Sequence, residues 1–207
     1  MKFRDVLKEP IYNISNFLSI SRVLLLPPFL FVDSLYRKEP QHPFWLPLLF
    51  ALILLAVLTD YLDGLLARRL HQTTKLGQYL DPVCDKIVTI VALFVLTLNY
   101  DFPYSVLGFY IVREIAGVWG GTFLYFKRDI QGRPNQWGKW GVGIVSISVI
   151  WYMLQPWLRT RMTADHFLLH PEYSAYVLVL VLGAGIAAYA RKYWRVVFLN
   201  QPPDKNT

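Results

Sequence analysis

Six long apolar segments divide this sequence, and they constrain the fold more than any other feature. They lie at residues 17–32, 44–66, 80–98, 104–126, 142–158 and 173–189. A helix needs about 20 residues to cross the hydrocarbon core of a bilayer, so the shorter segments must include flanking residues to span it. With 55% hydrophobic and 17% charged residues, the composition is typical of a membrane protein. The sequence therefore predicts an all-α integral membrane protein, a bundle of six transmembrane helices.

The lysines and arginines between these segments predict which side of the membrane each connection faces. Fourteen lie at the two termini and in the second and fourth connections, whereas the opposite side has four, namely Arg37, Lys38, Arg159 and Arg161. We therefore expect both termini and the segment at residues 60–64 to face the cytoplasm. The membrane itself is expected to be a bacterial cytoplasmic (inner) membrane. Attraction of basic residues to anionic lipid headgroups accounts for the net charge of +7 without nucleic acid.

The two ends of the chain carry separate expectations. Residues 1–15 are predicted to be an interfacial segment with a short helix, because Phe3, Val6, Leu7 and Ile11 share one side of it and basic residues the other. Residues 200–207 are predicted to form a flexible tail. The sequence shows no internal repeat, so we expect residues 1–199 to form one helical membrane domain.

Four aspartates lie where the second and third apolar segments meet, in the stretch DYLDGLLARRLHQTTKLGQYLDPVCDK at residues 60–86. Asp60 and Asp63 are three residues apart and Asp81 and Asp85 are four apart, so each pair shares a face of its predicted helix. A short connection brings these helix ends together, which can converge all four carboxylates on one small volume. Asp81, followed by Pro82, could alternatively mark an ordinary helix start, but that interpretation does not explain all four acids.

These acids need positive charge nearby, because each carboxylate at the centre of a membrane helix costs about 2.5–3.5 kcal/mol and like charges repel. Lys86 and Arg68 are candidates, but two cationic side chains do not balance four carboxylates. Oxygen ligands favour Mg²⁺ or Mn²⁺ over zinc or copper, and four aspartates could hold two such ions. Since two metals can stabilise the attacking and leaving oxygens of a displacement at phosphorus, the residues indicate a phosphorylated substrate.

The residues between the aspartates are compatible with a bound ligand. Gly64 and Ala67 leave space against the backbone, although small residues at this spacing also permit close helix packing. Arg68 offers a planar fork that matches phosphate oxygens. Gly77 could allow the backbone to approach a ligand or could simply form a turn.

This pattern resembles the signature of the CDP-alcohol phosphotransferase (CDP-alcohol phosphatidyltransferase) family. The match holds at every fixed position and gap, Asp60-x2-Asp63-Gly64-x2-Ala67-Arg68-x8-Gly77-x3-Asp81-x3-Asp85. The resemblance implies transfer of a phosphatidyl group from CDP-diacylglycerol to an alcohol, with release of CMP. It further implies that the four aspartates bind two divalent ions, that Asp85 is also the general base, and that the CDP moiety contacts Gly64, Ala67, Arg68 and Gly77.

Other segments are similar to the phosphatidylglycerophosphate synthase and cardiolipin synthase branches of this family. They are NFLSISRVLLLPP at residues 16–28, LDPVCDK at residues 80–86 and IVREI at residues 111–115. Within the last of these, Arg113 could contact the acceptor or could pair with a helical acid such as Glu114 or Asp101.

The acceptor itself is less strongly indicated. Lys139 in WGKWG could reach an acceptor phosphate, but glycerophosphate-using relatives often continue with a second lysine and a threonine, where this chain has Gly141 and Val142. We expect glycerol 3-phosphate as acceptor, giving phosphatidylglycerophosphate; phosphatidylglycerol, giving cardiolipin, and an inositol phosphate are the alternatives. A divalent-cation transporter is the alternative from a different class, for which acids at several membrane depths are expected. The resemblance also implies a homodimer surrounded by membrane lipids.

Overall fold

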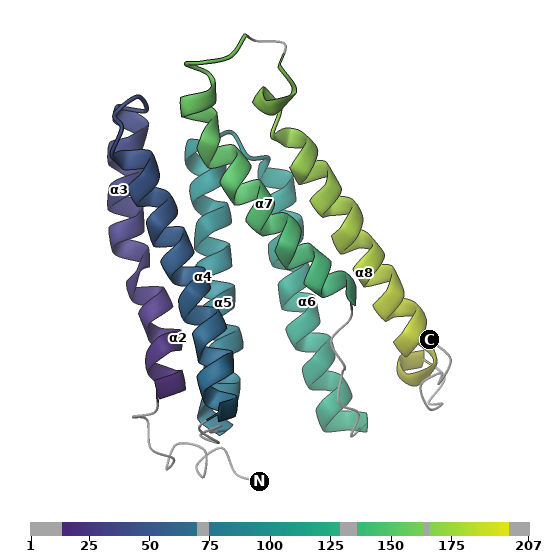
Figure 1. The fold of residues 1–207 in the computed structure, drawn as a ribbon. Helices are drawn as coiled ribbons and strands as arrows, with labels where there is room; N and C mark the ends of the chain where they lie inside the picture. Colours follow the sequence, from purple (N-terminus) through teal and green to yellow (C-terminus); the bar gives the residue numbers. More distant parts are fainter. Residues whose placement is uncertain (1–13, 70–74, 129–135, 164–165, 199–207) are drawn as a thin grey trace. The chain divides into compact units, whose positions relative to one another are not determined.

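The computed structural model describes residues 14–69, 75–128, 136–163 and 166–198, with the side chains of residues 17–60, 81–120, 136–163 and 166–191. All regular structure in these ranges is helical, which confirms the all-α prediction. In chain order the elements are α2 (Ile14–Leu24), α3 (Leu26–Lys38), α4 (Trp45–Arg69), α5 (Lys75–Asn99), α6 (Tyr104–Arg128), α7 (Gln136–Leu158), the 3-10 helix η1 (Phe167–Leu169) and α8 (Glu172–Phe198) (Figure 1).

Each predicted apolar segment coincides with a helix, the first with the pair α2 and α3. Three stretches of the described chain are long and apolar enough to cross a membrane, at Phe17–Lys38, Gln136–Leu158 and Glu172–Arg191, and Trp45–Asp60 is a shorter apolar helix. These long apolar helices indicate a membrane protein. The prediction of six transmembrane helices stays a prediction. The expected interfacial helix before residue 14 and the expected tail at residues 200–207 lie outside the described residues.

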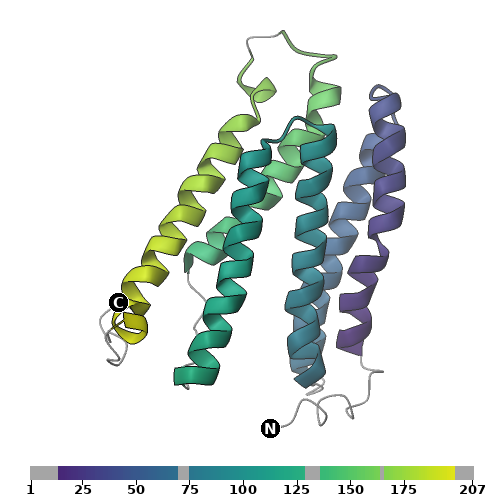
Figure 2. The same cartoon turned by 180° about the vertical axis from the view of Figure 1, so that it is seen from behind.

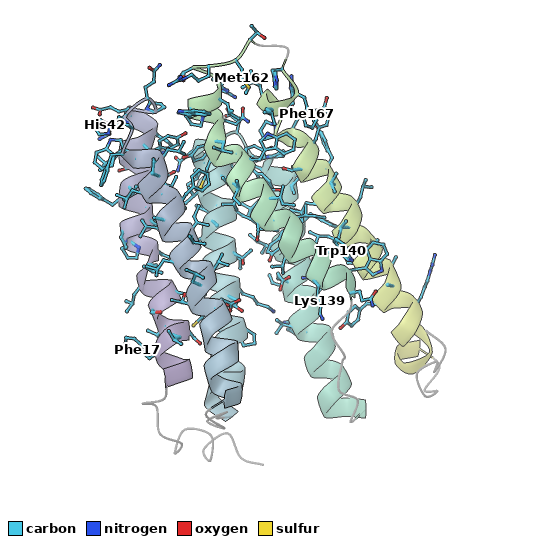
Figure 3. All side chains as sticks on the ribbon, viewed as in Figure 1. Phe17, His42, Lys139, Trp140, Met162 and Phe167 are labelled. Atoms are coloured by element: carbon cyan, nitrogen blue, oxygen red, sulfur yellow. The ribbon has the colours of Figure 1, made fainter. Side chains whose placement is uncertain are left out.

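The chain divides into two compact units, residues 1–92 and residues 93–207. In the first unit, α2 and α3 follow one another with a break at Leu25, and α4 packs antiparallel to both (Figure 1). Pro27 and Pro28 lie in the first turn of α3, where a missing backbone N–H is tolerated. His42 lies in the turn that leads from α3 into α4 (Figure 3).

Helix α5 begins earlier than its apolar residues indicate. It starts at Lys75 and continues through Pro82, so Asp81 lies inside the helix and the interpretation of Asp81 as a helix start is wrong. A proline inside a helix removes one backbone hydrogen bond, which neighbouring groups can replace in membrane helices. Asp81 and Asp85 therefore lie on one continuous helix, and their four-residue spacing puts them on one face.

In the second unit, α8 packs against both α7 and α6 (Figures 1 and 2). Small residues lie at the contact between α7 and α8. A Cβ atom placed on Gly141 would lie 3.1 Å from Leu182 Cδ2, and one placed on Gly185 would lie 3.2 Å from Trp137 Cβ. Glycine at these positions therefore allows the two helices to approach closely.

The connection from α7 to α8, which carries Met162 and Phe167, is attached to the last turns of α7 (Figure 3). Trp151 Nε1 and Gln155 Nε2 both donate hydrogen bonds to the backbone oxygen of Leu168, over 2.8 and 2.7 Å. Gln155 is buried, so this bond satisfies its amide nitrogen, which would otherwise be costly inside the unit.

Candidate active site

Three of the four signature aspartates have described side chains, and they come from two helices of the first unit. Asp60 lies on α4, and Asp81 and Asp85 lie on α5. All three contact side chains of a third helix, α2. Asp63 follows Asp60 on α4, and its side chain lies outside the described residues.

Arg22 of α2 joins the carboxylates of the other two helices. Its Nη1 atom donates to Asp60 Oδ1 over 2.6 Å and also to Asp85 Oδ1. The Arg22 side chain is only 4% exposed, whereas those of Asp60 and Asp85 are 61% and 50% exposed. The cation therefore lies on the interior side of the two acids. Because both carboxylates contact the same nitrogen, α4 and α5 place them next to each other.

Ser19 connects the third acid to the same cation. The Ser19 hydroxyl is fully buried and donates a hydrogen bond to Asp81 Oδ1. Arg22 Nη2 in turn donates to Ser19 Oγ over 3.3 Å. Ser19 and Arg22 are three residues apart, so they share one face of α2. One face of α2 therefore binds all three described aspartates.

The sequence interpretation missed this role of Ser19 and Arg22. The sequence interpretation named Lys86 and Arg68 as candidate partners of the acids. The Arg68 side chain lies outside the described residues. The arginine in contact with two aspartates is Arg22. The signal was present, because an arginine inside an apolar helix needs an acidic partner and usually marks a functional site.

The donor set fits a divalent cation by its chemistry. Carboxylate oxygens are the preferred protein ligands of Mg²⁺ and Mn²⁺. Three ionised aspartates and one guanidinium give Asp60, Asp81, Asp85 and Arg22 a combined charge of −2. Among the residues whose side chains are described, no group of three or more acidic, histidine or cysteine side chains is arranged as a metal site. The assignment of two ions to Asp60, Asp63, Asp81 and Asp85 therefore stays a prediction.

The predicted nucleotide-contacting residues all lie on helical backbone. Gly64, Ala67 and Arg68 are in the last third of α4, and Gly77 is in the first turn of α5. Gly77 is thus not part of a turn between helices, which removes the simpler explanation for that glycine. The side chains here lie outside the described residues, and the contacts to CDP stay predictions.

The two predicted acceptor residues belong to the second unit. Arg113 of α6 pairs with its neighbour Glu114, which is one of the two interpretations of this arginine. A Cβ atom on Gly138 would lie 3.5 Å from Arg113 Nη2, so Arg113 approaches α7 beside the residue that precedes Lys139. Lys139 itself is exposed near the start of α7 (Figure 3). The two cationic side chains thus come from adjoining parts of α6 and α7.

Comparison with known proteins identifies the family. The family model described as CDP-alcohol phosphatidyltransferase matches residues 12–188, which include all eight signature positions. The chain belongs to the CDP-alcohol phosphatidyltransferase family. This confirms the resemblance found in the sequence. Members of the family generally depend on a divalent metal.

Three relatives carry the name CDP-diacylglycerol–glycerol-3-phosphate 3-phosphatidyltransferase. The protein of Aquifex aeolicus is 33% identical over 142 residues, 67% of this chain and 74% of the relative. That of Haemophilus influenzae is 44% identical over 133 residues, 62% of this chain and 69% of the relative. That of Escherichia coli K12 is 39% identical over 89 residues, 43% of this chain and 46% of the relative. The family and these relatives identify this chain as a phosphatidyltransferase of phospholipid biosynthesis.

Proposed function

We propose that this CDP-alcohol phosphatidyltransferase is a phosphatidylglycerophosphate synthase. It transfers the phosphatidyl group of CDP-diacylglycerol to glycerol 3-phosphate and releases CMP. The names of the relatives supply the two substrates. The observation that carries the proposal is the convergence of Asp60, Asp81 and Asp85, three fixed positions of the family signature, on the buried Ser19 and Arg22.

The aspartates hold the metal that the reaction needs. We assign two Mg²⁺ or Mn²⁺ ions to Asp60, Asp63, Asp81 and Asp85, because a carboxylate cluster of this charge suits hard divalent cations. When bound, the ions neutralise the donor diphosphate and the charge that develops as CMP leaves. The other steps depend on side chains that bind and orient the substrates and on one that accepts a proton.

Asp85 has the role of general base. The acceptor hydroxyl oxygen forms a bond to the phosphatidyl phosphorus while the bond from that phosphorus to the CMP phosphate oxygen breaks, and the hydroxyl proton passes to Asp85. A positioned general base of this kind contributes about 10²–10⁴-fold to a rate. Half of the Asp85 side chain is exposed, so an acceptor can reach its carboxylate.

The two substrates use different parts of the chain. Gly64, Ala67, Arg68 and Gly77 contact the CDP moiety, since they occupy the family's nucleotide-contacting positions along α4 and α5. Arg113 and Lys139 bind the acceptor phosphate. The second lysine and the threonine of many glycerophosphate-using relatives are Gly141 and Val142 here, so Lys139 and Arg113 must supply the positive charge.

We infer the membrane arrangement from the apolar segments, the distribution of basic residues and the family resemblance. The chain crosses a bacterial inner membrane six times as a homodimer, with both termini and the aspartates at the cytoplasmic face. The acyl chains of the donor then remain in the bilayer while its CDP group lies among the carboxylates, and glycerol 3-phosphate arrives from the cytoplasm.

The test is CMP release by the purified protein in detergent with CDP-diacylglycerol and Mg²⁺ or Mn²⁺. Glycerol 3-phosphate, phosphatidylglycerol and inositol phosphate are added in separate reactions, with EDTA as the metal-free control. Release that needs metal and glycerol 3-phosphate supports the proposal. Release with one of the other acceptors identifies a cardiolipin or phosphatidylinositol phosphate synthase instead. A protein that binds the metal but neither binds nor cleaves CDP-diacylglycerol would contradict transferase activity and favour a cation transporter.

A further inference from the structure

We propose that Arg22 is a built-in counter-cation of the aspartate cluster, which positions Asp60 and Asp85 and competes with divalent cations for their oxygens. The inference rests on the proposed metal-dependent transfer and adds to it a residue outside the family signature. Arg22 acts through the aspartates, so it is a positioning residue and does not itself react.

The first argument is the pattern of contacts. One nitrogen of Arg22 binds a carboxylate from α4 and another from α5, and the second nitrogen reaches Asp81 through Ser19. A guanidinium has a rigid planar arrangement of donors, so its contacts fix the relative positions of the groups that it binds. Arg22 therefore determines how far apart α4 and α5 hold their acids.

The second argument compares Arg22 with another arginine of the same unit. Arg37 Nε binds one buried carboxylate, that of Asp33 one helical turn earlier on α3, over 3.0 Å. That local pair shows that one carboxylate is enough to form the ion pair of an arginine in this unit. Arg22 instead binds two acids that are 38 and 63 residues away in sequence, and both are signature positions. The contacts of Arg22 thus join two acids of the aspartate cluster, which is more than pairing the charge of one arginine requires.

The third argument is electrostatic. The guanidinium is a cation in contact with Asp60 Oδ1 and Asp85 Oδ1, two oxygens that the proposed metal site also uses. A divalent ion bound to these carboxylates is repelled by the guanidinium, and the repulsion is only partly screened because Arg22 is buried. Arg22 therefore weakens metal binding while keeping the carboxylates in place for catalysis.

The experiment compares Arg22→Gln, Arg22→Lys and the control Arg37→Gln, all as full-length protein in detergent. Binding of Mn²⁺ alone is measured from the electron paramagnetic resonance signal of free Mn²⁺. We expect Arg22→Gln to bind Mn²⁺ about 3–10-fold more tightly than wild type, the size of a screened charge interaction. Arg22→Lys, which keeps the charge, should stay within about 2-fold of wild type, as should Arg37→Gln.

A second measurement, thermal unfolding with and without Mn²⁺, does not depend on enzymatic activity. Because a ligand stabilises the folded state more when it binds more tightly, Mn²⁺ should raise the Tm of Arg22→Gln by about 2–4 °C more than it raises that of wild type. Arg37→Gln should lower the Tm equally with Mn²⁺ and with EDTA. An Arg22→Gln protein that folds only with Mn²⁺ would support the same conclusion, since the metal then replaces the missing cation.

Kinetics test the positioning role. Arg22→Lys should lower kcat about 10-fold and Arg22→Gln about 100-fold, with less than a 3-fold change in KM for CDP-diacylglycerol, because displaced catalytic groups slow the chemical step. Unchanged or weaker Mn²⁺ binding in Arg22→Gln overturns the counter-cation role. If that variant does not fold, wild-type kinetics in Arg22→Lys overturn the positioning role. CMP release by the wild-type protein tests the proposed function separately. If the wild type is active and one of these two contradicting results is found, the role proposed for Arg22 is refuted and the proposed function is not.

Discussion

Arg113 and Glu114 are neighbours in α6, and their side chains pair with each other through Arg113 Nη1 and Glu114 Oε1. Adjacent residues on a helix point in different directions, so the long arginine side chain must bend back to reach its neighbour. The other terminal nitrogen of Arg113, Nη2, approaches α7 at Gly138. Arg113 thus has both an acidic partner and a position beside the segment that carries Lys139.

This pair allows the two interpretations of Arg113 to be separated. If Arg113 binds the acceptor phosphate, Arg113→Gln should raise KM for glycerol 3-phosphate by about 10-fold or more, since charge-assisted bonds to phosphate are worth about 1.5–3 kcal/mol. Glu114→Gln should leave that KM within about 3-fold of wild type. If the arginine serves only the ion pair, both variants will lower the Tm in detergent and neither will change KM. Initial rates at saturating CDP-diacylglycerol, together with thermal unfolding, decide between these results.

Asp85→Asn tests the general base. Asparagine has nearly the same shape and can still accept a hydrogen bond from Arg22, so we expect the variant to fold and to bind CDP-diacylglycerol. Its CMP release should fall by about 10²–10⁴-fold, because the amide cannot accept the acceptor proton. The control is Asp101→Asn, an exposed aspartate with a φ of 60°, a conformation that asparagine adopts well. Near wild-type turnover in Asp85→Asn would remove Asp85 from the base role.

Lys139→Ala tests the other acceptor residue. The exposed position near the start of α7 indicates that the substitution will not disturb packing (Figure 3). We expect KM for glycerol 3-phosphate to rise about 3–30-fold while kcat at saturating acceptor changes little, the pattern produced when a uniform binding contact is lost. Lys38→Ala, at an exposed lysine of the first unit, serves as the control. An unchanged KM in the presence of saturating donor would show that Lys139 does not bind the acceptor.

The contact between α7 and α8 gives a prediction about stability. Gly185→Ala places a methyl group 3.2 Å from Trp137 Cβ, an atom next to the backbone that cannot rotate away, so the helices must separate slightly. Overpacking of this kind costs about 1–3 kcal/mol, and the Tm in detergent should fall. Gly183→Ala is the matched control on the same helix: nothing lies within 4 Å of its added Cβ atom, and alanine favours a helix by about 1 kcal/mol. Equal Tm values for the two variants would contradict this packing.

The sequence predicted the elements of the fold much better than it predicted the environment of the site. Long apolar segments are sufficient to locate helices, because a buried backbone must satisfy its own hydrogen bonds. The beginning of α5 was harder, since its first turns contain glycine, glutamine and Pro82, which are not typical of a membrane helix. Helical spacing correctly placed Asp81 and Asp85 on one face.

The contacts of Arg22 could not have been derived from local patterns. Its partners lie 38 and 63 residues further along the chain, and no spacing rule connects helices that are so far apart in sequence. Local reasoning chose Arg68 and Lys86 because they are close to the acids along the chain. A search for the partner of every charged residue in an apolar segment would have identified Arg22 as a residue to explain, but not which carboxylates it binds.

The sequence separation between Arg22 and its partners has a consequence for biogenesis. Translation proceeds from the N-terminus, so α2 is synthesised before α4 and α5, and the ribosome must add 38 further residues before Asp60 exists and 63 before Asp85 does. When α2 has been synthesised, the two acids that Arg22 contacts in the folded protein are therefore still absent from the chain. The contacts that join α2 to α4 and α5 can therefore form only after residue 85 has been added to the chain.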